Sequence, residues 1–185
     1  SGVVGFGPAG PPGGFDPARR VLTFTTAPLE NDLEIAGPVK LVLYASSTAR
    51  DTDFFVKLSD QFPQAPDDRA KGLNPFTEIV TRGWLRASHR ALDPARSSDM
   101  VPDHTHVDPQ PLTPGEIYKF EISLEPTAYL IKQGHRLRLE IVNGDSPATE
   151  ILWSHYYRPD KIGKDTICHD AAHPSELILP VSQFA

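Results

Sequence analysis

Prolines are spread along most of this chain, and they limit more than any other feature what it can fold into. Nineteen of its 185 residues are proline. Proline fixes φ and lacks an amide hydrogen, so it interrupts helices and the central strands of a sheet. Short elements joined by loops tolerate proline best. The sequence therefore favours an all-β fold built from short strands.

Hydrophobic residues between the prolines alternate with polar ones. Successive side chains of a strand point to opposite faces, so alternation predicts strands with one buried and one solvated face. In 53–60, for example, Phe54 and Leu58 share a face that Phe55 and Lys57 do not. The segments with this pattern are 21–26, 39–46, 53–60, 117–124, 136–143 and 176–181. Such strands, bounded by Gly, Pro and Asp, predict a β-sandwich or jelly roll.

Two further stretches carry more specific local signals. We interpret 76–90 as one strand with a β-bulge at Gly83, where the missing Cβ lets a strand bend. A helix is the competing interpretation, but the β-branched residues of this stretch favour a strand. Residues 126–141 predict a strand, a turn at Gln133–Gly134 with positive φ at the glycine, and a second strand in tight connection.

The ends and the bulk composition of the chain set its organisation. Residues 1–19 contain six glycines and four prolines, so we predict a linker or loosely held arm there. The remainder, 20–185, is expected to form one β-sandwich domain, and its length suffices for a core without disulfides. Cys168 is the only cysteine, so no internal disulfide can form.

Charge and hydropathy exclude several classes of partner. The formal net charge of −6 favours neither nucleic acid nor an anionic membrane surface. No apolar run predicts a transmembrane helix, and the first residues lack the pattern of a signal peptide. We therefore treat the location as unknown, with the cytoplasm as the default expectation.

The stretch 103–108, DHTHVD, is the strongest candidate for metal binding. His104, His106 and Asp108 have a His-x-His-x-Asp spacing that resembles the metal motif of metallo-β-lactamase-like hydrolases. Alternate residues of an extended segment point the same way, so three ligands can converge. However, Pro109 stands where that motif continues with histidine. We keep the three residues as weak metal candidates and favour a solvated loop.

A second histidine pair offers even less for a metal. His169 and His173 lie beside Cys168 and Asp170. Structural zinc requires four ligands with paired spacing, and this stretch does not supply them.

No stretch of the sequence marks a catalytic nucleophile. The Gly-x-Ser-x-Gly elbow is absent, and Ser88 and His89 would point to opposite faces of a strand. Asp51 and Asp53 suit a glycosidase pair or a calcium site, but aspartates before a strand also cap turns, and we favour capping. The residues thus predict neither a catalytic group nor a cofactor.

Four stretches, in this order, resemble the C-terminal domain of the cocaine esterase and X-Pro dipeptidyl peptidase (CocE/NonD) family of serine hydrolases. They are 20–60, TRGWLRASHR at 81–90, 111–147 and HDAAHPSELILPV at 169–181. The resemblance implies a jelly-roll β-sandwich with a galactose-binding-like fold. In the family this domain follows an α/β-hydrolase domain that carries the catalytic triad, so no catalytic position maps onto this chain.

The implied function is therefore that of an accessory, non-catalytic part of a hydrolase acting on esters, amides or X-Pro dipeptides. Its expected partner is the α/β-hydrolase domain of the same protein, whose pocket the sandwich borders. Homo-oligomer contacts also occur in the family. A sandwich that normally borders a larger domain exposes an apolar patch when isolated, so we expect self-association or a missing partner domain.

Two other functions stay open. Galactose-binding-like sandwiches often bind sugars, so the alternative is a stand-alone carbohydrate- or ligand-binding module in which aromatic side chains stack on the ring. That platform would consist of Trp84, Trp153, Tyr156 and Tyr157, for which we favour a packing role. A metal-dependent hydrolase using the DHTHVD residues is the least favoured.

Two arginines late in the chain have a predicted structural role. Arg136 and Arg138 are expected to reach carboxylates such as Asp51 or Asp53 and to hold sheet edges by charge-assisted hydrogen bonds.

Overall fold

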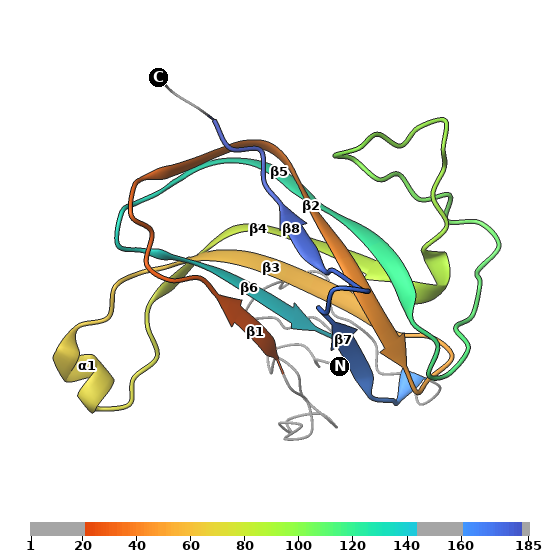
Figure 1. Ribbon diagram of the computed structural model, residues 1–185, viewed down its shortest axis with the longest axis horizontal. Coiled ribbons are helices and arrows are strands. Elements are labelled where there is room, and N and C mark those ends of the chain that lie inside the picture. Colours follow the sequence, from red (N-terminus) through yellow and green to blue (C-terminus); the bar gives the residue numbers. More distant parts are fainter. Residues whose placement is uncertain (1–20, 144–160, 183–185) are drawn as a thin grey trace, which may run out of the picture.

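The computed structural model describes residues 21–143 and 161–182 (Figure 1). The predicted linker at 1–19 and the aromatic residues Trp153, Tyr156 and Tyr157 lie outside this part. Among the described residues, no helix is long and apolar enough to cross a membrane. The elements are β1 Leu22–Thr25, β2 Leu33–Ser47, β3 Asp53–Gln61, α1 Pro66–Ala70, β4 Thr77–Arg86, the 3-10 helix η1 Ala87–His89, β5 Tyr118–Ile131, β6 Arg136–Val142, β7 Asp165–Cys168 and β8 Glu176–Ile178.

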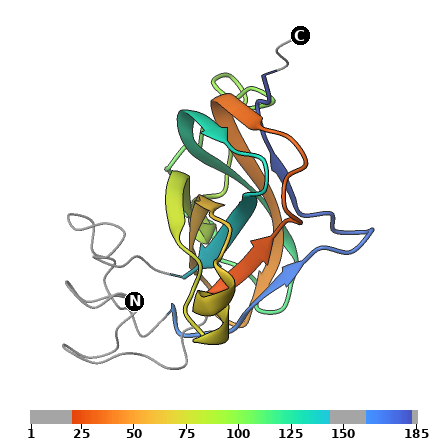
Figure 2. The same cartoon turned by 90° about the vertical axis from the view of Figure 1, so that its left-hand side faces the viewer.

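The strands form an antiparallel sheet that curls into two layers. Their order is β1-β6-β3-β4-β5-β2-β7, and β8 pairs with β2. β4 and β5 share a single register pair, Gly83 with Leu124, so the sheet bends at this point. One layer therefore contains β1, β6, β3 and β4, and it faces the layer of β5, β2, β7 and β8 (Figure 2). The predicted all-β sandwich is confirmed, while its galactose-binding-like character stays a prediction.

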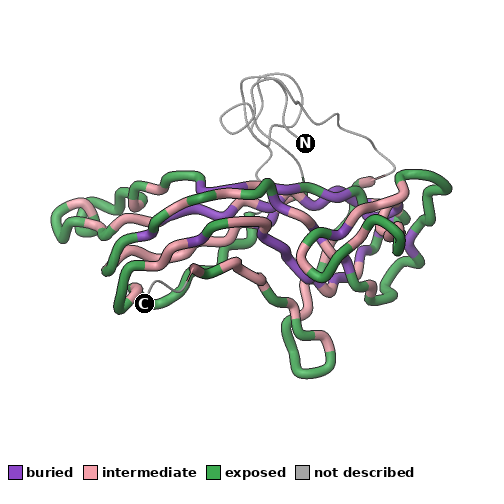
Figure 3. Tube along the Cα trace, turned by 90° about the horizontal axis from the view of Figure 1, so that it is seen from above, coloured by how far each residue is buried: buried purple, intermediate pink, exposed green. Residues whose placement is uncertain are grey.

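The hydrophobic core lies between these layers. Phe54 of β3 and Phe120 of β5 are each 1% exposed, and their ring centroids are 5.0 Å apart, so this pair joins the two layers. Alternation placed the buried residues correctly: Phe54 and Leu58 are buried, whereas Phe55 is only partly so. Figure 3 shows the buried segments concentrated along the paired strands. Each such side chain stabilises the fold by about 1.5–3 kcal/mol.

Strand β2 is longer than the predicted segment 39–46. Its first half, from Leu33, pairs with the last residues of β5. The register shifts between Gly37 and Val39, and Gly37 has φ of 133°. Sequence reasoning missed this half because glycine followed by proline normally ends a strand; it also missed β7.

The segment 76–90 forms β4 and then η1, so the strand prediction is confirmed. The predicted bulge at Gly83 is wrong, because the register shifts where Val80 is left unmatched against β3. Glycine at position 83 instead allows strands β4 and β5 to approach each other closely. A Cβ there would lie 2.2 Å from the carbonyl oxygen of Ser123 on β5. Only glycine lets the two layers meet at this distance.

The predicted turn at Gln133–Gly134 is present, with φ of 84° at the glycine. The strands that it joins do not form a hairpin, however. β5 lies beside β2, while β6 lies between β1 and β3. The turn therefore carries the chain from one layer of the sandwich to the other.

Candidate functional site

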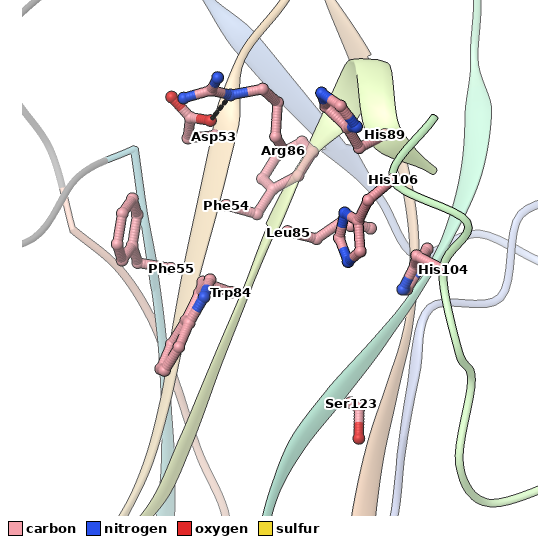
Figure 4. Close-up of a pocket in the computed structure, with 10 residues that line it drawn as sticks. All are labelled: Asp53, Phe54, Phe55, Trp84, Leu85, Arg86, His89, His104, His106 and Ser123. Atoms are coloured by element: carbon pink, nitrogen blue, oxygen red, sulfur yellow. Dashed lines mark hydrogen bonds and ion pairs between the residues drawn. The ribbon is translucent and has the colours of Figure 1, made fainter. Parts of the chain in front are cut away.

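An open pocket of about 400 Å³ lies over β3 and β4. Phe55 and Trp84 lie on one side of it, and three histidines, His89, His104 and His106, lie on the other (Figure 4). The ion pair of Asp53 with Arg86 lies at the upper edge of that view. The pocket thus combines an aromatic surface with charged and hydrogen-bonding groups, which is typical of binding sites.

Strand alternation places the aromatic side of the pocket. Leu85 of β4 points into the core and is 4% exposed, so its neighbours Trp84 and Arg86 point outward. Trp84 is 57% exposed. In the register of β3 with β4, Trp84 is opposite Phe55, and Arg86 is opposite Asp53. Cross-strand neighbours of this kind are in side-chain contact, so the four residues form one continuous surface.

Asp53 is a buried carboxylate held by two cations. Nε of Arg86 is 2.9 Å from its Oδ1, and Nζ of Lys161 is 2.5 Å from its Oδ2. Nδ2 of Asn143 donates to its backbone carbonyl at 3.3 Å. Burial alone would raise the pKa of Asp53, but the hydrogen bonds from Lys161 and Arg86 outweigh burial and hold that pKa below its ordinary value. Asp53 therefore stays ionised and is unsuited to general-acid catalysis.

Asp51 caps the turn before β3. Its Oδ1 accepts hydrogen bonds from the backbone amides of Thr52 at 3.1 Å and Ser88 at 2.9 Å. Its Oδ2 accepts one from the Ser88 hydroxyl at 3.0 Å. These are the contacts that the capping interpretation predicts. They fasten the start of β3 to η1, and so fix the position of His89.

The predicted pairing of Arg136 and Arg138 with these aspartates is wrong. Nη1 of Arg136 donates to the carbonyl of Thr26 at 2.6 Å, and Nη2 of Arg138 donates to Glu140 at 2.9 Å. The register of β6 explains the difference. Arg138 is opposite Ser59, six residues along β3 from Asp53, which is a separation of about 20 Å.

The histidine side of the pocket comes from η1 and the long loop that follows it. His89 ends η1, and His104 forms an isolated β-bridge with Leu92 that fixes the loop. The ring centroid of His106 is 5.7 Å from that of His89 and 5.9 Å from that of His104. The structure thus adds His89 to the two histidines that the sequence singled out.

Two imidazole nitrogens in this group lack hydrogen-bond partners within the described part of the chain. They are Nδ1 of His89 and Nε2 of His104, and both atoms are buried. Burial lowers the pKa of His104, and the neighbouring His106 lowers it further, so His104 is neutral at pH 7. Leaving a buried polar atom unpaired costs about 1–3 kcal/mol, so these two atoms lower the stability of the fold.

The DHTHVD residues do not adopt the arrangement that metal binding requires. His106 and Asp108 have positive φ values of 53° and 50°, so the segment is not extended. The rings of His104 and His106 both line the pocket, with centroids 5.9 Å apart. Asp108 does not line the pocket. Over residues 21–143 and 161–182, no group of three or more His, Cys, Asp or Glu side chains could hold a metal ion.

The second histidine pair is likewise occupied with local packing. The ring of His169 lies edge-on to Phe24, with centroids 6.2 Å apart. Nδ1 of His173 is 3.3 Å from Oδ1 of Asp170. Cys168 is a free thiol at the end of β7.

The described residues do not form a hydrolytic triad. A serine hydrolase requires a hydroxyl hydrogen-bonded to a histidine base. Ser88 instead donates to Asp51, and Ser175 donates to a backbone carbonyl. In the described part, no serine or cysteine side chain is hydrogen-bonded to an imidazole. The pocket is lined by one serine, Ser123, and the described residues give it no hydrogen bond to a histidine base.

Sequence reasoning found only part of this site. It singled out Trp84, and the other three members of its aromatic platform lie outside the described residues. It missed the roles of Arg86 and His89, although Arg86 shares the outward face of β4 with Trp84. No local signal could have identified Lys161, which is 108 residues from Asp53 in the chain.

Comparisons with known proteins identify what the chain is similar to. Residues 15–178 match the family model described as the X-Pro dipeptidyl-peptidase C-terminal non-catalytic domain. A Mycobacterium bovis protein provisionally named a serine esterase is 35% identical over 168 residues, which are 89% of this chain and 24% of that protein. The cocaine esterase of a Rhodococcus species is 27% identical over 168 residues, 87% of this chain and 25% of the esterase.

A solved structure shows the same fold. A CocE/NonD family hydrolase from Staphylococcus aureus superposes with a TM-score of 0.72 and 25% identity, and the match covers 89% of this chain and 33% of that one. The chain thus spans about a quarter of the two curated relatives and a third of the solved structure.

Proposed function

This chain belongs to the family of X-Pro dipeptidyl-peptidase C-terminal non-catalytic domains, and we propose that it is the accessory β-sandwich of a serine hydrolase. In this proposal it packs on an α/β-hydrolase domain of the same polypeptide and helps to shape the pocket of that domain. The bond-breaking groups belong to the hydrolase domain. The substrates of the whole enzyme are esters, amides or X-Pro dipeptides.

The observation that carries the proposal is the share of each relative that the chain covers. A sandwich that aligns over 89% of its own length accounts for only 24% of a protein named as an esterase. The rest of that protein has ample length for a catalytic domain. The lack of a hydrolytic triad in the described residues supports the same division of labour.

An ester-hydrolysis assay tests the proposal together with the coding sequence around this chain. We expect the 185-residue chain alone to leave p-nitrophenyl acetate unchanged above the buffer rate. The surrounding reading frame is expected to encode an α/β-hydrolase domain, and the longer product should hydrolyse the ester. Turnover by the isolated chain that a serine-directed reagent abolishes would overturn the accessory role.

One observation favours a second function, a ligand-binding module. Trp84 is 57% exposed and borders a pocket that also presents the guanidinium of Arg86 and three imidazoles. Aromatic platforms with nearby hydrogen-bonding groups suit sugar rings. A glycan-binding screen of the chain and of its Trp84→Ala variant checks this function, which predicts binding by the first and none by the second.

A further inference from the structure

The outward face of β4 differs from the other exposed apolar sites of the described chain. Arg82, Trp84 and Arg86 alternate along it, so an exposed indole stands between two guanidinium groups. Phe76 and Val107 are exposed on loops, and four more apolar side chains are exposed on strands: Leu22, Phe24, Ile79 and Leu130. Among these exposed side chains, only Trp84 is flanked by two arginines on its own face of the strand. Tryptophan and arginine are the residues most enriched among those that dominate the binding energy of interfaces.

Arg86 has hydrogen-bonding capacity that the described residues do not use. Nε of Arg86 donates a hydrogen bond to Asp53, and within the described residues the two terminal nitrogens of Arg86 make no hydrogen bond. A guanidinium with a free pair of terminal N–H groups is suited to a carboxylate, which it binds through two parallel hydrogen bonds. The imidazoles of His89 and His104 line the same pocket, but their unpaired Nδ1 and Nε2 atoms are buried within the domain.

From these features we infer that the pocket bounded by Trp84, Arg86, His89 and His104 is the surface on which the hydrolase domain of the same polypeptide docks. The docking segment presents an acidic side chain to Arg86 and apolar surface to Trp84. This inference rests on the proposed function and adds to it the face that is used. The chain length favours this occupant, because about three quarters of each curated relative lies outside the matched sandwich.

Docking would satisfy groups that the isolated sandwich leaves unpaired. The side chain of Arg86 is 43% exposed, and an acidic side chain of the docking segment would bind the terminal nitrogens of its guanidinium. Covering Trp84 removes the indole from water, which favours association. An interface built this way has an aromatic centre and a polar rim.

Hydroxyl-radical footprinting read by mass spectrometry tests this face directly. The isolated chain and the longer polypeptide that contains it are oxidised in parallel. We expect Trp84 to be modified readily in the isolated chain and to lose most of its modification in the longer polypeptide. Phe76 is the internal control: it is 67% exposed, lies between α1 and β4, and should react equally in both.

The outcomes separate the docking face from the proposed function. If the longer polypeptide hydrolyses esters but its Trp84 stays as reactive as in the isolated chain, the docking face is wrong while the accessory role stands. If the reading frame encodes no hydrolase domain, the accessory role itself fails. Protection of Trp84 that grows with the concentration of the isolated chain would assign the face to a second copy and overturn the inference.

Two substitutions that each introduce a negative charge give an independent check. Trp84→Glu should lower the Tm of the longer polypeptide further than that of the isolated chain, where the indole is 57% exposed. It should also lower the esterase activity of the longer polypeptide. Phe76→Glu is the matched control at a similarly exposed aromatic residue and should leave the esterase activity of the longer polypeptide unchanged. Equal activity losses for the two variants would contradict the docking face.

Discussion

Nδ1 of His135 donates to the buried carboxylate of Asp60, at 2.9 Å from Oδ1 and 3.0 Å from Oδ2. Asp60 lies on β3 and is 2% exposed, while His135 lies in the connection from β5 to β6. The ring of Phe62 packs on His135 with centroids 4.4 Å apart. This pair therefore fixes the point at which the chain passes between the layers of the sandwich.

Asp60→Ala should lower the free energy of unfolding by about 2–3 kcal/mol, because it leaves the largely buried Nδ1–H of His135 without its acceptor. Urea unfolding followed by tryptophan fluorescence measures this change. The matched control is Lys132→Ala, which removes an exposed ion pair with Asp32 in the same β5–β6 connection. Exposed pairs contribute little, so the control should barely move the midpoint. Equal effects for both variants would show that burial of Asp60 is unimportant.

Gly83→Ala should be among the most destabilising single-methyl substitutions in the chain. The added Cβ would lie 2.2 Å from a backbone oxygen of β5, so the two layers must separate. We expect a loss of about 3 kcal/mol or more in unfolding free energy, at the upper end of overpacking effects. Differential scanning calorimetry detects this as a lower Tm.

Gly115→Ala provides the control for this substitution. Gly115 has φ of 85° and open space around the position of a Cβ, so only backbone strain of about 1 kcal/mol is expected. If Gly83→Ala is no worse than Gly115→Ala, close approach between β4 and β5 does not matter for stability.

The strands and their buried faces were predictable because they depend on local alternation. Phe54 and Leu58 are buried where a period of two predicts them. The role of Gly83 was not predictable, since glycine inside a strand indicates a bulge or a close approach, and only the partner strand decides between them. The turn at Gly134 was correct in conformation, yet its strands pair elsewhere because pairing depends on the whole sheet.

The candidate site was less predictable because distant segments assemble it. Trp84 was found from residue type alone. The cation for Asp53 was assigned to Arg136 or Arg138, whereas Arg86 and Lys161 bind it. Choosing among these requires the register of β3 with β4 and β6, which no spacing within one segment encodes.

Metal content is a further point on which the chain can be tested. We expect the purified chain to carry no stoichiometric zinc, manganese or iron, and incubation with EDTA to leave its Tm unchanged. The reason is that Asp108 lies outside the pocket that His104 and His106 line, so the three side chains do not form one set of ligands. Elemental analysis by plasma mass spectrometry measures this, with His104→Ala as the comparison. One metal ion per chain, lost in that variant, would contradict the expectation.

The stability of the chain should fall in acid in part through Asp53. Its pKa is lowered in the folded protein, because the hydrogen bonds from Lys161 and Arg86 outweigh the effect of burial. A lowered folded pKa means that the contribution is complete above the unfolded value, near 3.8, and is lost as the pH falls through the folded value. The free energy of unfolding should therefore be steady near pH 6 and decline below about pH 4.

Asp53→Asn tests this assignment because it keeps the size of the side chain and removes its charge. At pH 7 we expect it to cost about 2 kcal/mol, the value of charge-assisted hydrogen bonds, and to make the acid decline shallower than in the unmodified chain. Glu140 and Glu121, whose pKa values are also lowered, preserve part of the slope. Glu30→Gln, at an exposed carboxylate, should leave the profile unchanged. Urea midpoints measured from pH 2.5 to 7 give the stability profile of each variant. Parallel profiles for Asp53→Asn and the unmodified chain would show that Asp53 does not contribute to the acid decline.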